Sequence, residues 1–200
     1  EPDLFSTTIT DYNYELVASS RRVEEGQSPH EEYCKQLNHA FDEAARVLKD
    51  DGVFSFVYSH SSVNGWDAVI RAYRQSDFFV SSVQPLSIER KGRPRAVLSQ
   101  AVNTCMAIVA RKSMETKQPI ELQDVLDWTK DYCTDFGSLL IEESGWSQAD
   151  AGLAVIACTV GKMANAREVK DSTDVDALIA ASKIVKDFFL EFSIKVRDSI

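Results

Sequence analysis

A seven-residue run of apolar, aromatic and β-branched residues constrains this chain more than any other feature. Residues 53–59 read Val-Phe-Ser-Phe-Val-Tyr-Ser, a pattern typical of a strand that helices cover on both faces. Such a strand needs hydrogen-bonded neighbours on both edges. Strands at about 79–88 and 103–111 supply one side, and no segment before Ser28 supplies the other. We therefore expect an incomplete sheet in a chain that is part of a larger domain.

The segments around this strand have clear start and stop signals. Ser28 is followed by a proline and, three residues on, by Glu31, which together predict the capped start of a helix that ends in the turn before Gly52. A second helix is expected after the strand, from Trp66 to about residue 76. The two later strands form a hairpin, and Pro85 indicates a bulge or a sheet edge in the first of them.

The C-terminal part of the sequence predicts helices only. They cover about 121–143, 147–164 and 174–197, and the last two follow the capping residues Ser and Thr. We accordingly expect two parts, a partial α/β domain over residues 1–112 and an all-α extension over 113–200.

The charge of the chain restricts the partners that it can be expected to bind. The chain has a net charge of −9, which argues against nonspecific nucleic-acid binding by the whole surface. One short segment is the exception, because four cations lie there beside a single acid. These cations are Arg90, Lys91, Arg93 and Arg95. They could bind phosphate groups without reading base sequence, or they could form an ordinary solvated turn.

Other candidate chemistry is weak. The four cysteines are scattered without a Cys-x-x-Cys pair, so we expect reduced, buried thiols and a cytoplasmic protein. The three histidines lack the paired spacing of metal ligands, and no metal site is expected. Trp128 and Tyr132 are predicted to lie in the helical core rather than to form a base-stacking platform. No apolar run approaches the roughly 20 residues that cross a bilayer, and no membrane association is expected.

Several sequence motifs resemble one enzyme family. Residues 41–49 read Phe-Asp-Glu-Ala-Ala-Arg-Val-Leu-Lys and run into Gly52-Val53-Phe54, and His60-Ser61-Ser62 and Trp66 follow. With the flanking Pro2-Asp3-Leu4-Phe5, these motifs are similar to those of predicted adenine-specific DNA methylases with an associated zinc ribbon. The resemblance extends over nearly all 200 residues.

The resemblance implies a fold and a cofactor. The fold is the C-terminal half of a class I methyltransferase sheet, which is Rossmann-like and has an antiparallel last strand beside the fifth. The cofactor of the parent enzyme is S-adenosyl-L-methionine. The family's glycine-rich cofactor loop and Asp-Pro-Pro-Tyr motif both precede the matched region, and this chain contains neither. We therefore expect no catalytic residue here and no activity from the chain alone.

The resemblance and the strand direction together predict one candidate site. Ligands of open α/β sheets bind beyond the carboxyl ends of the strands, and His60, Ser61 and Ser62 follow the strand at 53–59. These three residues are expected at the rim of the cofactor or target-base pocket. The simpler alternative is that one of the serines only caps the following helix.

Three functions remain open from the sequence. The first is the distal part of a DNA adenine methyltransferase, which meets DNA through the parent enzyme. The second is a non-catalytic, methyltransferase-like scaffold that binds a partner chain, its own missing N-terminal half or a second copy along the open sheet edge. The third is a methyltransferase that acts on RNA or a small molecule.

Overall fold

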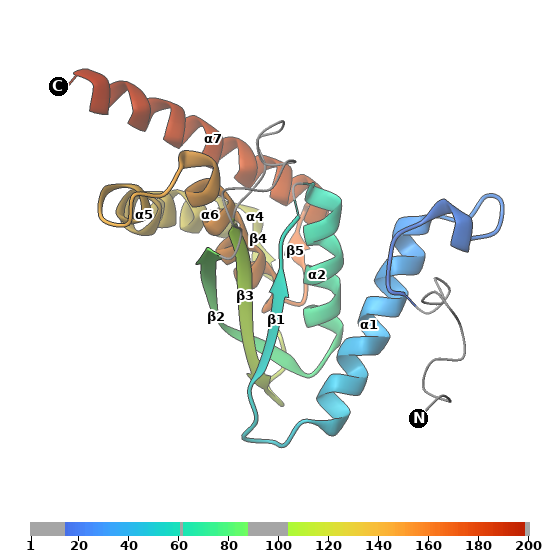
Figure 1. Ribbon diagram of the computed structural model, residues 1–200. Helices are drawn as coiled ribbons and strands as arrows, with labels where there is room; N and C mark the ends of the chain where they lie inside the picture. Colours follow the sequence, from blue (N-terminus) through green and yellow to red (C-terminus); the bar gives the residue numbers. More distant parts are fainter. Residues whose placement is uncertain (1–14, 61, 88–103, 199–200) are drawn as a thin grey trace, which may run out of the picture.

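The fold is mixed α/β and contains a three-stranded antiparallel sheet (Figure 1). The computed structural model describes residues 15–60, 62–87 and 104–198. Strands β1 (Phe54–Tyr58), β2 (Phe78–Ser87) and β3 (Thr104–Lys112) are ordered β1-β3-β2, so the last strand lies between the other two. β3 runs antiparallel to both neighbours. The predicted hairpin of β2 and β3 is confirmed.

The two helices that precede and follow β1 begin at the predicted caps. Helix α1 (Pro29–Val47) starts after Ser28, whose hydroxyl oxygen accepts a hydrogen bond from the backbone N–H of Glu31. Helix α2 (Val63–Gln75) starts after Ser62, whose hydroxyl oxygen accepts from the N–H of Gly65. Each cap satisfies a backbone donor that the first helical turn leaves without a partner.

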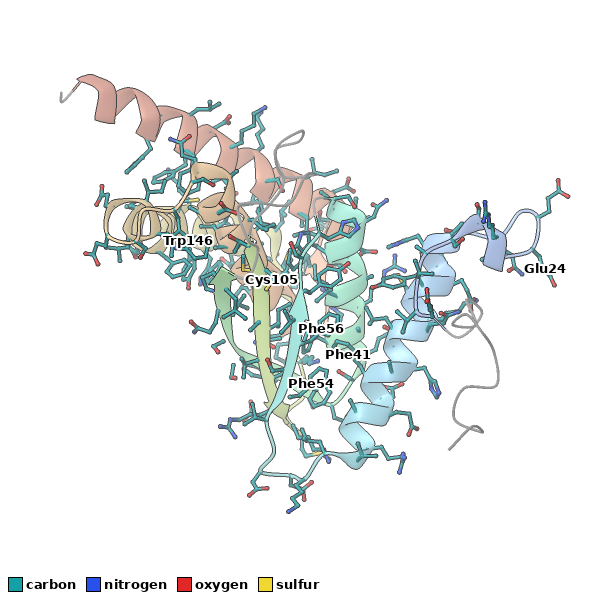
Figure 2. All side chains as sticks on the ribbon, viewed as in Figure 1. Glu24, Phe41, Phe54, Phe56, Cys105 and Trp146 are labelled. Atoms are coloured by element: carbon teal, nitrogen blue, oxygen red, sulfur yellow. The ribbon has the colours of Figure 1, made fainter. Side chains whose placement is uncertain are left out.

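Phe41 joins these helices to the sheet. Its ring makes edge-to-face contacts with Phe54, Phe56, Tyr73 and Phe78, at centroid distances from 4.8 to 6.3 Å. The contacts therefore connect α1 with β1, α2 and β2 in one aromatic cluster (Figure 2). Edge-to-face pairs of this kind stabilise a core beyond the effect of buried area.

The expectation that helices cover both faces of the first strand is wrong. Burial alternates along β1, and Val57 is 52% exposed. The residues that contact α1 and α2 are Phe54, Phe56 and Tyr58, which share one face of the strand. The continuous apolar run therefore did not show that helices cover only one face of this strand.

The C-terminal part is helical apart from one very short strand pair. Two-residue strands β4 (Ile120–Glu121) and β5 (Val169–Lys170) pair in parallel, which the sequence did not predict because two residues show no periodicity. The remaining elements are a 3-10 turn at Ser20–Arg22, α4 (Leu122–Tyr132), a π-helical turn at Cys133–Gly137, α5 (Ser138–Glu142), α6 (Gln148–Ala164) and α7 (Asp174–Asp198). Where one helix was expected over 121–143, the π turn separates α4 from α5.

Helix α6 packs on the same sheet face as α1 and α2. A side chain at Gly161 would lie 3.1 Å from Val83 and 3.2 Å from Val80, so glycine allows the close approach of α6 to β2. Just beyond α6, the amide of Asn165 accepts from the N–H of Val80 and donates to its carbonyl oxygen. The helical part and the sheet therefore share one hydrophobic core.

β2 is an edge strand within the described sheet, as Pro85 suggested. The irregularity in its pairing, however, lies between Val80 and Ser82, and Pro85 pairs in register with Met106. The bulge therefore occurs near Asn165 rather than at the proline.

All four cysteines are buried, as predicted, and each carries a thiol group. Among the described helices, none combines the length and apolar content needed to span a bilayer.

Arg74 on α2 forms a largely buried ion pair with the first residue of α7. Its guanidinium binds both carboxylate oxygens of Asp174, at 2.5 and 2.9 Å, and donates to the carbonyl oxygens of Ala166 and Met163. Both charged side chains are largely buried.

Replacing Arg74 with Met should leave the carboxylate of Asp174 without its cation in a poorly hydrated position. We expect the free energy of unfolding, measured by urea denaturation, to fall by about 3 kcal/mol. The control is Arg46→Ala, which breaks an exposed pair with Glu43 and should cost less than about 1 kcal/mol. Equal, small effects of the two changes would contradict this role of Arg74.

Candidate functional site

The principal cavity lies beyond the carboxyl end of β1 and has a volume of about 580 Å³. His60 and Ser62 line it from the loop between β1 and α2, and Tyr33 lines it from α1. Residues 16–18 form a further wall. The volume falls within the range of about 300–1,000 Å³ that is usual for small-molecule sites. Two of the three predicted rim residues therefore line a real cavity.

Local hydrogen bonds fix the loop that carries these residues. Nδ1 of His60 accepts a hydrogen bond from the N–H of Ser62 at 3.0 Å, and the indole N–H of Trp66 donates to the carbonyl oxygen of His60 at 2.9 Å. In the neutral ring the proton therefore resides on Nε2 of His60. Ser62 also caps α2, so this residue makes the capping contact of the simpler alternative and lines the main cavity as well.

Two tyrosines give the cavity an aromatic wall. The ring of Tyr58 stacks with that of His60, at a centroid distance of 6.1 Å and an interplanar angle of 11°. Its hydroxyl group donates to the carbonyl oxygen of Gly65 and interacts with Tyr33. Burial raises the pKa of both tyrosines, so both are protonated at neutral pH and act as hydrogen-bond donors. The wall can stack on a planar group, and Tyr33 can donate a hydrogen bond to it, because the hydroxyl proton of Tyr58 is already donated to Gly65.

The remaining predicted residues lie outside the described part of the chain. These residues are Ser61 and the four cations of the basic segment. The four cations are Arg90, Lys91, Arg93 and Arg95. Their assignment to phosphate binding stays a prediction.

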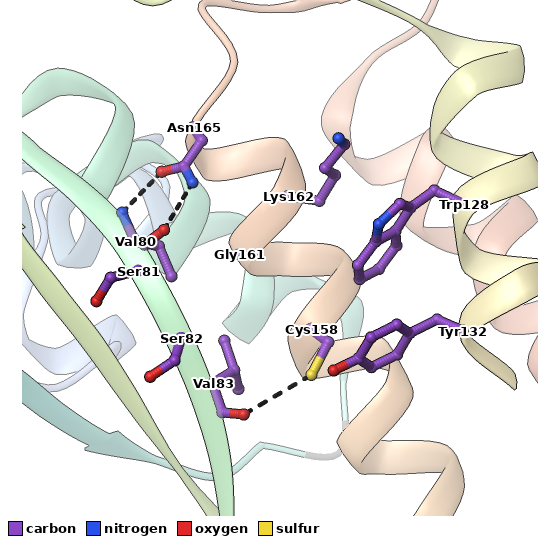
Figure 3. A pocket seen from close by; sticks show the side chains of 10 residues that line it. All are labelled: Val80, Ser81, Ser82, Val83, Trp128, Tyr132, Cys158, Gly161, Lys162 and Asn165. Atoms are coloured by element: carbon purple, nitrogen blue, oxygen red, sulfur yellow. Dashed lines mark hydrogen bonds between the residues drawn. The ribbon is translucent and has the colours of Figure 1, made fainter. Parts of the chain in front are cut away.

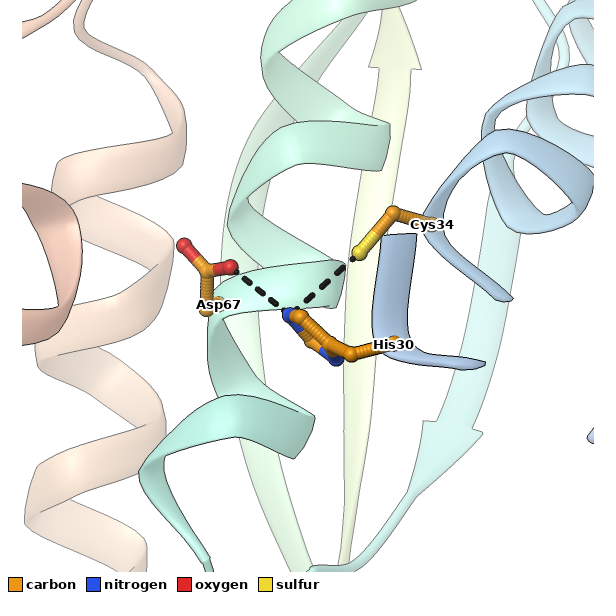
Figure 4. Close-up of side chains that lie close together, drawn as sticks. All are labelled: His30, Cys34 and Asp67. Carbon is orange, nitrogen blue, oxygen red and sulfur yellow. Dashed lines mark hydrogen bonds and ion pairs between the residues drawn. The ribbon is translucent and has the colours of Figure 1, made fainter. Parts of the chain in front are cut away.

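A second polar cluster, which the sequence did not predict, adjoins the main cavity. Nε2 of His30 lies 3.1 Å from Oδ2 of Asp67 and 3.5 Å from Sγ of Cys34 (Figure 4). His30 lines the cavity, whereas Cys34 and Asp67 are each 2% exposed. His30 and Cys34 are four residues apart on α1, a spacing that places them on one helical face. Asp67, 37 residues after His30, comes from α2 and has no local sequence signal.

The geometry of this cluster is not that of a nucleophile with a general base. Cys34 and Asp67 both approach the same nitrogen of His30, whereas a catalytic triad uses the two ring nitrogens separately. Burial raises the pKa of the Cys34 thiol to about 11, which leaves it protonated and unreactive at neutral pH. Arg71 also binds Asp67, with Nε 3.0 Å from Oδ2.

A smaller cavity of about 220 Å³ lies between β2, α4 and α6 (Figure 3). Trp128 and Tyr132 stack on each other beside Lys162, with their ring centroids 4.6 Å apart. Both rings are half-buried, and Tyr132 packs against the core. These two residues therefore lie at the edge of the predicted helical core, where they line a surface cavity.

The comparisons with known proteins add no relative. No family model, no curated protein and no solved structure matches the chain.

Gly65 controls the shape of the main cavity. A Cβ atom at this position would lie 2.3 Å from Cγ of His60, so the ring has to move if alanine replaces glycine. We expect Gly65→Ala to shift the NMR signals of the His60 ring and to lower the free energy of unfolding by about 1–3 kcal/mol.

The matched control for this change is Asn64→Ala, at the preceding, exposed position of α2. It should leave both quantities close to those of the wild type. Unchanged His60 signals in Gly65→Ala would show that the described packing of the loop is incorrect.

Proposed function

We propose that this chain is the distal part of an S-adenosyl-L-methionine-dependent DNA adenine methyltransferase and that it has no activity alone. The observation that carries the proposal is the strand order. The family resemblance requires a last strand that pairs antiparallel beside the 53–59 strand, and β3 pairs in this way with β1. β3 also pairs antiparallel with β2, so β1 and β2 point in the same direction, as successive strands of a parallel sheet do.

The main cavity supports the proposal by its position and lining. It lies at the carboxyl end of β1, where α/β sheets bind ligands. Enzymes that modify a base inside a duplex rotate it out of the helix and stack it on aromatic groups. Tyr33, Tyr58 and His60 offer such a surface. In this proposal they form one wall of the target-base pocket.

The residues of this cavity do not by themselves fit S-adenosyl-L-methionine. A nucleotide-type site binds ribose hydroxyl groups with an acidic side chain and approaches the ligand through a glycine-rich turn. No acidic residue lines the described cavity, and the sequence has no Gly-x-Gly motif. In this proposal, binding of the cofactor and alignment of the amine with its methyl group belong to parts of the parent enzyme other than these 200 residues. This chain contributes the opposite wall.

The direct test compares this chain with the polypeptide encoded by its full native reading frame. Each would be incubated with labelled S-adenosyl-L-methionine and unmethylated duplex DNA, and the label would be followed into N6-methyladenine. We expect incorporation by the longer polypeptide and none by residues 1–200. Transfer only to RNA or to a small molecule would overturn the assignment to DNA.

Within the active polypeptide, His60→Ala should lower kcat/KM for duplex DNA by roughly 10- to 100-fold, because stacking on the displaced base is lost. His39→Ala is the matched control, since His39 is an exposed histidine on α1 that does not line the cavity. Equal activity of the two variants would remove His60 from the base pocket.

Charge reversal at both Arg93 and Arg95 should weaken DNA binding by the active polypeptide. If each residue contacts one phosphate, the slope of log affinity against log salt concentration should become shallower by about 2. Arg46→Glu reverses a charge on the exposed surface of α1 and serves as the control. An unchanged slope in the double variant would reject phosphate binding by this segment.

The second candidate function is a methyltransferase-like scaffold that binds a partner chain. The observation that favours it is β1, which has a strand neighbour on one edge only within the described sheet and exposes Val57 on its open face. Unpaired strand edges are sites of strand addition. Absence of methyl transfer from the polypeptide of the full reading frame would favour this function over the first.

A further inference from the structure

We propose that His30, Cys34 and Asp67 form a Zn²⁺ site that links the first two turns of α1 and α2. The three side chains present an imidazole nitrogen, a sulfur and a carboxylate oxygen, all within 4.8 Å of one another. They come from two helices that begin beside the main cavity. The inference does not depend on methyl transfer.

The two donor distances from His30 are close to those around a tetrahedral zinc ion, and the third pair of donors lies within 4.8 Å. Zinc bonds of about 2.0–2.1 Å to nitrogen and oxygen and about 2.3 Å to sulfur place neighbouring donors roughly 3.3–3.6 Å apart. Nε2 of His30 lies 3.1 Å from the oxygen of Asp67 and 3.5 Å from the sulfur of Cys34. Small side-chain adjustments around His30 bring all three donors to one ion.

The donor types select zinc among the common divalent cations. Mg²⁺ and Ca²⁺ take oxygen ligands, whereas a mixture of thiolate, imidazole and carboxylate is a zinc set. When the ion binds, the sulfur of Cys34 forms a bond to zinc and the thiol proton leaves to solvent. Water from the adjoining cavity supplies the fourth ligand in this proposal.

The charges around the cluster favour a divalent cation. Before an ion binds, the carboxylates of Asp67 and Glu31 stand against the single guanidinium of Arg71, so the net charge is −1. When Cys34 becomes a thiolate on binding, the net charge of these groups becomes −2, which one Zn²⁺ neutralises. Arg71 keeps its contact with Asp67 and orients that ligand, as outer hydrogen-bond partners do in metal sites.

Without a metal, His30 cannot satisfy both neighbours well. A ring nitrogen either donates one proton or offers one lone pair in the ring plane, so Nε2 forms one good hydrogen bond with Asp67 or with Cys34. An ion at the point where the three donors converge uses the lone pairs of all of them. This difference separates a metal site from a hydrogen-bonded polar cluster.

The test uses the full 200-residue chain after treatment with a chelator. Co²⁺ replaces Zn²⁺ in tetrahedral sites and gives intense d–d absorption together with a sulfur-to-cobalt charge-transfer band. We expect one equivalent of Co²⁺ to bind with both signals and to be displaced by Zn²⁺. Zn²⁺ should also raise the melting temperature, because it binds the folded state in preference. Co²⁺ spectra of octahedral type without a sulfur band would overturn the proposal.

Variants identify the ligands. Cys34→Ala should abolish the charge-transfer band, and His30→Ala should weaken Co²⁺ binding by roughly 100-fold or more. The controls are Cys133→Ala, which removes a buried thiol elsewhere, and His39→Ala, which removes an exposed imidazole from the same helix. Both controls should bind Co²⁺ as the wild type does. Loss of the band in Cys133→Ala with retention in Cys34→Ala would place the site elsewhere.

A measurement on the unmodified protein covers the case in which a variant fails to fold. X-ray absorption of the zinc-loaded chain should show one sulfur ligand and three nitrogen or oxygen ligands. A shell of nitrogen and oxygen atoms alone, or a shell of two or more sulfur atoms, would contradict the assignment.

Discussion

The contact of Phe41 with the sheet is the interaction on which the rest of this structure depends. One ring from α1 reaches aromatic residues of β1, α2 and β2, and it is 2% exposed. Because the helix is rigid, fixing Phe41 also fixes the first turn of α1 about three turns away. That turn carries His30, and Cys34 lies on the same face one turn further along the helix. The position of the main cavity and of the polar cluster beside it therefore follows from packing in the hydrophobic core.

Much of the fold was predictable because its signals are local. Ser28, Ser62 and Ser147 each cap a helix through a hydrogen bond to a backbone N–H, and the sequence marks such caps directly. The hairpin of β2 and β3 was also evident. The open face of β1 was not, because its apolar residues run without a break and periodicity cannot then tell one covered face from two. Pairing of β4 with β5 depends on contacts between segments almost 50 residues apart.

The candidate site also has a part that the sequence predicted and a part that it did not. His60 and Ser62 could be placed beyond the end of a strand, since this position follows from strand direction alone. The cluster of His30, Cys34 and Asp67 combines a local and a distant element. The spacing of four between the first two residues was available in the sequence, whereas Asp67 joins them only because α2 packs along α1. A search for ligand spacing within one segment therefore could not complete the set.

Asn165 has a consequence for how this sheet can grow. Its side-chain amide bonds both backbone groups of Val80 and so occupies the place that a neighbouring peptide group would take on the outer edge of β2. A strand arriving on that side would have to displace the amide at the bulge. Within the described residues, no side-chain amide covers the outer edge of β1 in this way. The two edges of the sheet therefore differ: the backbone of β2 at Val80 is already hydrogen-bonded, whereas the outer edge of β1 has no strand neighbour among the described residues.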